Sequence, residues 1–189
     1  MANEALTVNN RVTSTVRDYL DAYPEEKDEL SPLLNLAAGT DSVTSCATMP
    51  GHVTCGVVAV DTTRRVLQIR HKALGLWLLP GGHVENDDLT LMGAAMRELS
   101  EETGILASSV RPLGELPVDI DVHEIPENAA KAESKHTHYD FRFILKIQDA
   151  RDPGSVDLQL DEVTDYRWIP ASELSGRIGR KVTTILREW

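Results

Sequence analysis

The sequence has few cysteines, no long apolar run and fewer basic than acidic residues. Its two cysteines, Cys46 and Cys55, are too few for a disulfide framework and lack the spacing of a metal site. We therefore expect two free thiols in a reducing cytoplasm. No apolar run approaches the roughly 20 residues needed to cross a bilayer, and the first ten residues lack the basic start and apolar core of a signal peptide. These absences predict a cytoplasmic protein with no membrane segment.

Basic residues are scarce relative to acidic ones. The 189 residues include 19 Lys and Arg against 30 Asp and Glu, which gives a formal net charge of −11. A surface with this charge repels nucleic-acid backbones and anionic membranes, so we exclude both as partners. An anionic small molecule is compatible with this charge only if a bound cation or a basic pocket offsets the repulsion.

The pattern of the chain changes near residue 45. Before it, apolar residues recur at helical spacing, and a second helical segment begins at Pro24 and ends at Gly39. We therefore interpret residues 1–45 as an N-terminal helical extension and residues 46–189 as the main domain. Helices over 89–104 and at the C-terminus alternate with β-branched strands, which predicts an α+β fold with a mixed sheet. The predicted strands are 52–61, 65–72, 110–125, 136–149 and 163–170.

The stretch MRELSEETGI places three glutamates on one helix face. Glu98, Glu101 and Glu102 are spaced i, i+3 and i+4, and like charges at this spacing repel by roughly 0.2–0.5 kcal/mol per pair. A solvated helix face is one interpretation. The apolar residues around the acids and the Gly-Gly pair before them favour a second, a site for Mg²⁺ or Mn²⁺, which prefer oxygen ligands. Arg97, four residues before Glu101, is placed to orient a carboxylate.

Residues 80–105, PGGHVENDDLTLMGAAMRELSEETGI, resemble the Nudix box, whose pattern is G-x5-E-x7-R-E-U-x-E-E-x-G-U with U an aliphatic residue. The second half of the box is matched without a gap by Arg97, Glu98, Leu99, Glu101, Glu102, Gly104 and Ile105. The first half contains one inserted residue, so the earlier Glu of the box has no direct counterpart, and Asp88 is the nearest substitute. In the family that Glu mainly supports the geometry between loop and helix. The insertion therefore concerns the loop shape more than the activity.

The resemblance implies both a fold and a reaction. The fold is a Nudix-type α/β/α sandwich over roughly residues 50–175. The reaction is hydrolysis of the diphosphate bond in a nucleoside diphosphate linked to another group, with Mg²⁺ or Mn²⁺ lowering the pKa of a bound water and a carboxylate taking its proton. The implied metal ligands are Glu98, Glu101, Glu102 and the carbonyl of Gly82, and the implied catalytic residues are the same glutamates with Arg97. Family members are often dimers, so a homodimer is a further expectation.

A fourth acid outside the box is a candidate for the same site. Glu162 stands six residues before Trp168, where some Nudix proteins place a Glu that approaches the metals. Glu162 is therefore either an extra metal ligand or general base, or an ordinary exposed acid.

Histidines, aspartates and one arginine are candidates for substrate binding. Asp119, Asp121 and His123 alternate along one predicted strand, and a strand has a period of two, so they share a face. If that strand pairs with the next, a second polar site forms that binds another cation or contacts the leaving group; the alternative is a solvated sheet face. The residues predicted to bind substrate are Arg70, His83, His123, His138 and Asp140, with His136 on the same strand face as the last two.

The sequence leaves the substrate and the role of the extension open. The marks of the ADP-ribose and dinucleoside-polyphosphate branches are absent, so we expect an unspecified small nucleoside diphosphate derivative. An inactive ligand-sensing module is an alternative, although such domains usually lose acids that this chain keeps. Prenyl-diphosphate isomerisation is a second alternative and requires a catalytic cysteine, for which Cys55 is the candidate. The extension covers the core, builds a dimer or shapes the specificity pocket.

Overall fold

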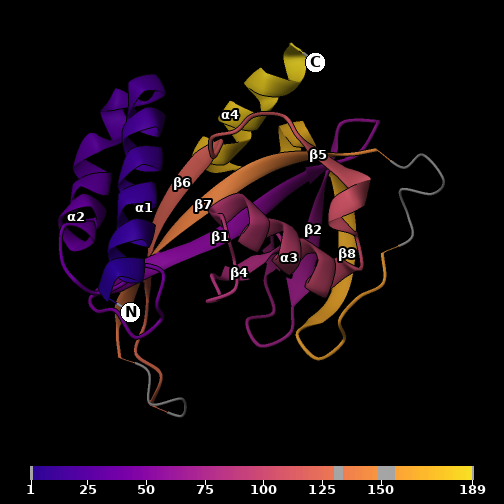
Figure 1. Cartoon of the computed structure of the whole chain (residues 1–189). Helices are drawn as coiled ribbons and strands as arrows, with labels where there is room; N and C mark the ends of the chain where they lie inside the picture. The colour runs from indigo at the N-terminus through magenta and orange to yellow at the C-terminus, as the bar shows by residue number, and fades with distance from the viewer. Residues whose placement is uncertain (1, 130–133, 149–155, 189) are drawn as a thin grey trace.

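A single twisted sheet with helices on both faces organises the chain (Figure 1). The computed structural model describes residues 2–129, 134–148 and 156–188. Its helices are α1 (Ala2–Ala22), α2 (Lys27–Ala37), α3 (Leu91–Thr103) and α4 (Gly176–Arg187), with short 3-10 helices η1 (Pro24–Glu26), η2 (Ala107–Ser109) and η4 (Ala171–Glu173). Its strands are β1 (Gly51–Val60), β2 (Arg65–His71), β3 (Trp77–Leu78), β4 (Gly81–His83), β5 (Val110–Pro112), β6 (Asp119–Ile125), β7 (His136–Ile147) and β8 (Val163–Pro170).

The sheet is built around one parallel strand pair. β1 and β7 run side by side from Gly51 opposite Thr137 to Val60 opposite Lys146. Every other pairing in the described part of the chain is antiparallel, and the main path runs β3-β2-β1-β7-β5, with β4 on β1, β6 on β7 and β8 on β2. All residues of β1 are buried, as expected for a central strand that is covered on both faces. The prediction of a mixed sheet is confirmed.

The two faces of the sheet contact different helices. Successive residues of β1 point to opposite faces: Val53 and Val57 belong to the core under α1, α2 and α3, whereas Val58 and Val60 pack with α4. This arrangement is the predicted α/β/α sandwich. The N-terminal helices contribute fully buried side chains, such as Val16, to the same core as α3. Over the described residues, no helix is long and apolar enough to cross a membrane.

Local signals define α3. Thr90 caps its N-terminus by accepting a hydrogen bond from Gly93 N at 2.9 Å. Gly104 follows its C-terminus with φ +69°, in the left-handed conformation that favours glycine, and donates to Ser100 O at 2.9 Å. The predicted helix end at Gly104 is confirmed. The Gly-Gly pair before the helix lies in a strand: Gly81–His83 is β4, held by antiparallel pairing to β1.

Buried charges connect the N-terminal helices to α4. The Lys181 ammonium on α4 donates to Glu26 at 2.6 Å, to Asp119 of β6 at 2.9 Å, and to the hydroxyl of Tyr19 on α1. The exposed side-chain fractions are only 8% for Lys181, 5% for Glu26 and 1% for Asp119. Arg177, one turn earlier on α4, also donates to Asp119, at 3.0 Å. An ion network therefore joins three segments that are distant in the sequence.

Candidate active site

The glutamates of α3 face strand β4. Glu102 accepts a hydrogen bond from the backbone N–H of Gly81 at 2.9 Å. Glu98 lies against the next residue, since a Cβ added to Gly82 would stand 2.6–2.8 Å from all three atoms of the Glu98 carboxyl group. Only glycine leaves this space open to the carboxylate. Helix α3 and strand β4 thus place two carboxylates and the backbone of Gly82 together.

Burial and like charges act on these acids. Burial, followed by the charges of Glu98, Glu162 and Glu101, raises the pKa of Glu102 to about 8, although the hydrogen bond from Gly81 opposes the shift. Burial also raises the pKa of Glu98, and Arg97 opposes that shift. Burial is the main cause of both raised pKa values, and the neighbouring carboxylates add to it. This is the environment that a bound cation stabilises.

Arg97 holds the loop and the helix in one arrangement. Its guanidinium donates two hydrogen bonds to Asp88, at 3.2 and 2.9 Å, and one to the carbonyl of His83 at 2.8 Å. It also donates to Glu98 at 3.1 Å and to Glu101 at 2.9 Å. The side chain of Glu101 remains 53% exposed. Asp88 therefore occupies the structural role that the sequence suggested for it, despite the inserted residue.

Glu162 comes to the same region from the segment before β8. Gln159 N donates to the Glu102 carbonyl at 3.2 Å, and Asp157 N donates to the Thr103 carbonyl at 3.0 Å, so this segment is anchored to the end of α3. Glu162 is exposed, and its charge contributes to the raised pKa values of Glu98 and Glu102.

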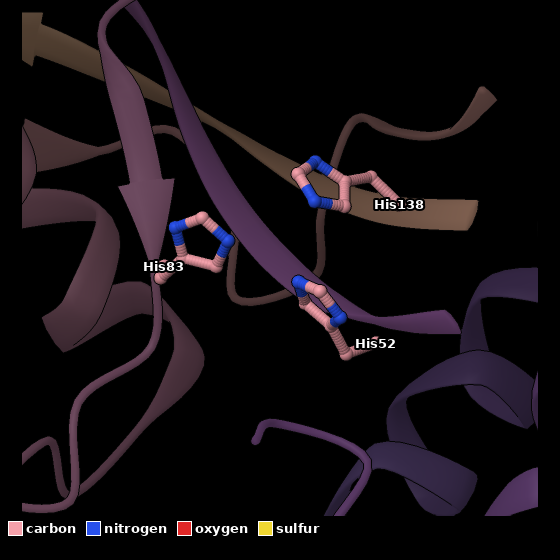
Figure 2. A group of neighbouring side chains, drawn as sticks. All are labelled: His52, His83 and His138. Carbon is pink, nitrogen blue, oxygen red and sulfur yellow. The ribbon is translucent and has the colours of Figure 1, made fainter. Parts of the chain in front are cut away.

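Histidines gather on the sheet face opposite α3. Figure 2 shows His52 from β1, His83 from β4 and His138 from β7 with their rings pointing toward one another, and ring nitrogens of the three lie within 4.8 Å of one another. His138 also contacts His136, at 3.0 Å between the two Nε2 atoms, and His123, at 5.5 Å between ring centroids. The sequence indicated four of these five residues but not His52, whose position at the start of an apolar strand carries no functional pattern.

The predicted pairing of the polar strands is confirmed, and Asp121 of β6 contacts His123 on the same strand, at 2.9 Å between Oδ2 and Nδ1. β6 pairs with β7 so that Asp121 lies opposite Asp140 and His123 opposite His138. Both of these aspartates, and Asp119 as well, form ion pairs with Arg142, at 2.9, 2.8 and 3.6 Å respectively. The alternative of a solvated face is wrong for Asp119 and His136, which are buried.

With this geometry established, comparison with known proteins assigns the family. The model of the NUDIX domain matches residues 50–186. The chain belongs to the Nudix family. A probable DHNTP pyrophosphohydrolase of Lactococcus lactis subsp. cremoris (strain MG1363) is 30% identical over 142 residues, which are 75% of this chain and 81% of that protein. An RNA pyrophosphohydrolase of Dinoroseobacter shibae (strain DSM 16493 / NCIMB 14021 / DFL 12) is 30% identical over 133 residues, 68% of this chain and 82% of that protein.

Solved structures have the same fold. A C. elegans Ap4A hydrolase in a binary complex aligns with a TM-score of 0.55 and 17% identity, covering 72% of this chain and 98% of that one. The predictions of a Nudix-type sandwich and of a Nudix hydrolase are confirmed. Residues 2–49, with α1 and α2, lie outside the matched domain.

The guanidinium of Arg70 lies 5.8 Å from the ring centroid of Trp77, on the β2–β3 pair, and its role in substrate binding stays a prediction.

The surroundings of Cys55 do not suit its suggested catalytic role. Cys55 pairs with Gly82 in the sheet, but its thiol is fully buried. Burial and nearby carboxylates raise its pKa, which makes it a poor nucleophile. The structure therefore gives no support to an isomerase with Cys55 as its catalytic residue.

A large cleft lies between the N-terminal helices and the Nudix loop. Its volume is about 1420 Å³, and α1, residues 40–48 and residues 84–92 form most of its walls. Arg11 of α1 donates to the carbonyl of Leu89 at 2.8 Å, which fastens the extension to the loop. Glu98 and Glu102 do not line the cleft. The N-terminal helices thus pack on the core, and α1 forms a wall beside the box.

Replacement of Gly82 by alanine tests the contact with Glu98. The new Cβ would displace the Glu98 carboxylate, so we expect kcat to fall roughly 10–100-fold, the usual effect of disturbing the support of a metal ligand. The melting temperature should change little, because the side chain of Glu98 can rotate away. Gly114→Ala is a matched control, since no atom lies within 4 Å of its added Cβ. Equal kcat values for the two variants would contradict this geometry.

The histidine group predicts a loss of stability in acid. Burial and neighbouring histidines lower the pKa of His52 to about 4 and that of His138 to about 3, while the backbone of Thr48 slightly opposes the shift at His52. Unfolded histidines titrate near 6.5, so between that pH and about 4 the unfolded chain binds more protons and the fold loses stability as pH falls.

Chelator-treated protein should show this loss in urea unfolding at pH 7 and pH 5. For His138→Gln we expect the loss between these pH values to be smaller by about 1–2 kcal/mol. His71→Gln serves as the control. His71 lies outside the histidine group, at the end of β2, where its ring accepts a hydrogen bond from Leu74 N. A wild-type-like loss in His138→Gln would contradict the shifted pKa.

Proposed function

We propose that this Nudix hydrolase uses Mg²⁺ or Mn²⁺ to cleave the diphosphate bond of a small nucleoside diphosphate derivative. The observation that carries the proposal is the convergence of Glu98 and Glu102 on the backbone of Gly82, with Arg97 holding the loop against the helix. The names of the relatives, which include two pyrophosphohydrolases, support the same reaction type.

The residues present fit a divalent cation. Glu98, Glu102 and the Gly82 carbonyl are hard oxygen donors. The pKa values of the two acids are raised chiefly by burial and further by the neighbouring carboxylates, and a bound cation would favour their charged forms. Glu101, exposed and held by Arg97, completes the proposed ligand set. A bound cation would neutralise substrate phosphate charge and lower the pKa of a coordinated water.

Each remaining side chain has a proposed task. Arg97 fixes the direction of Glu98 and Glu101, and Asp88 fixes Arg97. Glu162, whose charge acts on both buried acids, is the proposed general base. Water then adds to phosphorus, the bridging P–O bond breaks, and the carboxylate takes the proton. The products are a nucleoside monophosphate and a phosphorylated remainder.

The identity of the group attached to the substrate's diphosphate is not determined by these residues. The relatives are named for DHNTP and RNA, and the structural neighbour for Ap4A. The net charge of −11 disfavours a long RNA. We therefore propose a small molecule. Arg70, His83, His123, His138 and Asp140 remain its predicted binding residues, although the three histidines lie on the sheet face opposite α3. A cytoplasmic location and a homodimer remain predictions.

A hydrolysis screen tests the proposal. The panel holds nucleoside triphosphates, ADP-ribose, nucleotide sugars, Ap4A, DHNTP and a 5′-triphosphorylated RNA, with Mg²⁺ and Mn²⁺ tested separately and Glu102→Gln as the blank. We expect one substrate to be cleaved well above the blank and the activity to stop in excess chelator. Undiminished turnover in chelator would contradict the metal site. A folded protein that cleaves nothing would favour the inactive sensing module.

A further inference from the structure

Five of the six histidines of this chain gather on one side of the sheet. They come from four strands: His52 from β1, His83 from β4, His123 from β6, and His136 and His138 from β7. Neighbouring ring centroids in this group lie 4.7–5.5 Å apart. Strands distant in the sequence supply them, so helical or strand periodicity alone does not explain the gathering.

His52 is the innermost member and is 1% exposed. In the described part of the chain neither of its ring nitrogens has a partner that meets hydrogen-bond geometry, although the Thr48 backbone lies near the ring. Buried polar atoms are nearly always bonded to protein, water or an ion. The rings of His83 and His138 flank His52 and bring their nitrogens within 4.8 Å, as Figure 2 shows. An ion between the three rings would satisfy the His52 nitrogen that faces them.

We propose that His52, His83 and His138 form a second metal site, for Zn²⁺ or a similar imidazole-preferring transition metal. Three histidines are a known zinc donor set that leaves one position for water or another ligand. Imidazole favours Zn²⁺, Co²⁺, Ni²⁺ and Cu²⁺ over Mg²⁺, which prefers oxygen. Tetrahedral ligand nitrogens stand roughly 3.4 Å apart, so small side-chain rotations close the set around one ion.

The surroundings separate this site from the carboxylates. Successive residues of a strand point to opposite faces, so Gly82 faces Glu98 while His83 faces away from α3. The nearest aspartates, Asp121 and Asp140, are held by Arg142 and are not needed as ligands. His136 stands beside the group: its Nδ1 contacts the carbonyl of Ser134 at 2.8 Å, and its Nε2 lies 3.0 Å from the Nε2 of His138. The two sites therefore lie on opposite faces of one short strand and differ in donor type.

Metal titration of the tag-free full chain tests the proposal without measuring hydrolysis. After treatment with chelator and its removal, the protein is titrated with Zn²⁺ in excess Mg²⁺, and separately with Co²⁺, whose visible absorption reports nitrogen ligation. We expect one equivalent of Zn²⁺ to bind and at least tenfold weaker binding in His83→Gln and in His138→Gln. His71→Gln, outside the group, and Glu102→Gln, in the carboxylate site, should bind Zn²⁺ like the wild type.

The variants also separate the other outcomes. His83 is exposed, so its substitution leaves the core intact and keeps the test valid even if His138→Gln folds poorly. Wild-type Zn²⁺ affinity in both histidine variants, or absence of Zn²⁺ binding in excess Mg²⁺, would overturn the proposal. Loss of Zn²⁺ binding in Glu102→Gln would assign the ion to the carboxylates instead. Failure of the hydrolysis screen has no bearing on these results.

Discussion

Glu102→Gln should lose roughly 10²–10⁴-fold in kcat while its metal-free form remains as stable as the wild type or becomes more stable. The amide oxygen can still accept the hydrogen bond from Gly81, so the contact to β4 survives. The substitution removes the negative charge of the Glu102 carboxylate, which the bound cation requires. Activity and stability should therefore change in opposite directions, which distinguishes a ligand from a residue that supports the fold.

The pH dependence sharpens this test. The pKa of Glu102 is about 8 in the fold, compared with an ordinary value of 4.5. As pH rises from 4.5 to about 8, the unfolded chain loses this proton before the folded one, so the metal-free fold loses stability. Glutamine removes that loss, and the melting temperature in chelator should exceed that of the wild type by a growing margin toward pH 8. Full activity in the variant would eliminate the assigned site.

A matched substitution controls for the change in net charge. Glu188→Gln removes one exposed carboxylate at the end of α4, far along the chain from the box. It should leave both kcat and the pH dependence of melting near wild type. If Glu188→Gln reproduced the stabilisation, a general charge effect would explain it, and the argument from the burial of Glu102 would fail.

Lys181→Met should destabilise the protein by about 3 kcal/mol, which is the low end of the cost of breaking a buried ion pair. The substitution leaves Glu26 and Asp119 buried with one cation fewer, although Arg177 still faces both. For a chain of this size, the expected fall in melting temperature is roughly 6–12 °C. Differential scanning calorimetry measures it directly.

Two further variants isolate the cause. Arg180→Met changes an exposed neighbour on the same helix and should have little effect. Adding Glu26→Gln to Lys181→Met neutralises the stranded acid and should recover part of the loss, as expected for coupled residues. A cost below about 0.5 kcal/mol for Lys181→Met would show that the network adds nothing. From these contacts we propose that residues 1–45 are an extension that depends on the catalytic domain for its structure.

The predictable part of the site is the part that is local in sequence. Glu98, Glu101 and Glu102 follow from helical spacing, and Gly104 from the chemistry of a helix end. The role of Asp88 could be suggested but not established, because the inserted residue changes the count while the chain still folds back onto Arg97.

The place of His52 in the histidine group and the ion pairs of Arg142 were not predicted, because both depend on pairing between strands that are distant in the sequence. His52 lies beside His83 and His138 because β1 pairs with both β4 and β7. The register of each pair depends on two distant segments together, so no single segment of the sequence predicts it. The ion pairs between Arg142 and the aspartates of β6 have the same origin. Arg142 sits on the same strand face as Asp140, and only the register of β6 brings Asp121 within its reach.

The central parallel pair also has a consequence for how the protein is made. β1 is buried along its whole length, yet its main partner β7 begins only at His136. At about 5–20 residues per second, a ribosome delivers β7 several seconds after β1 has emerged. β2 and β4 are made before β7 and pair with β1 on its other edge. We expect the nascent chain to present the edge of β1 that receives β7 unpaired during that interval. Slower growth at low temperature, or a holding chaperone, should therefore raise the yield of soluble protein more than any change at the surface of the finished fold.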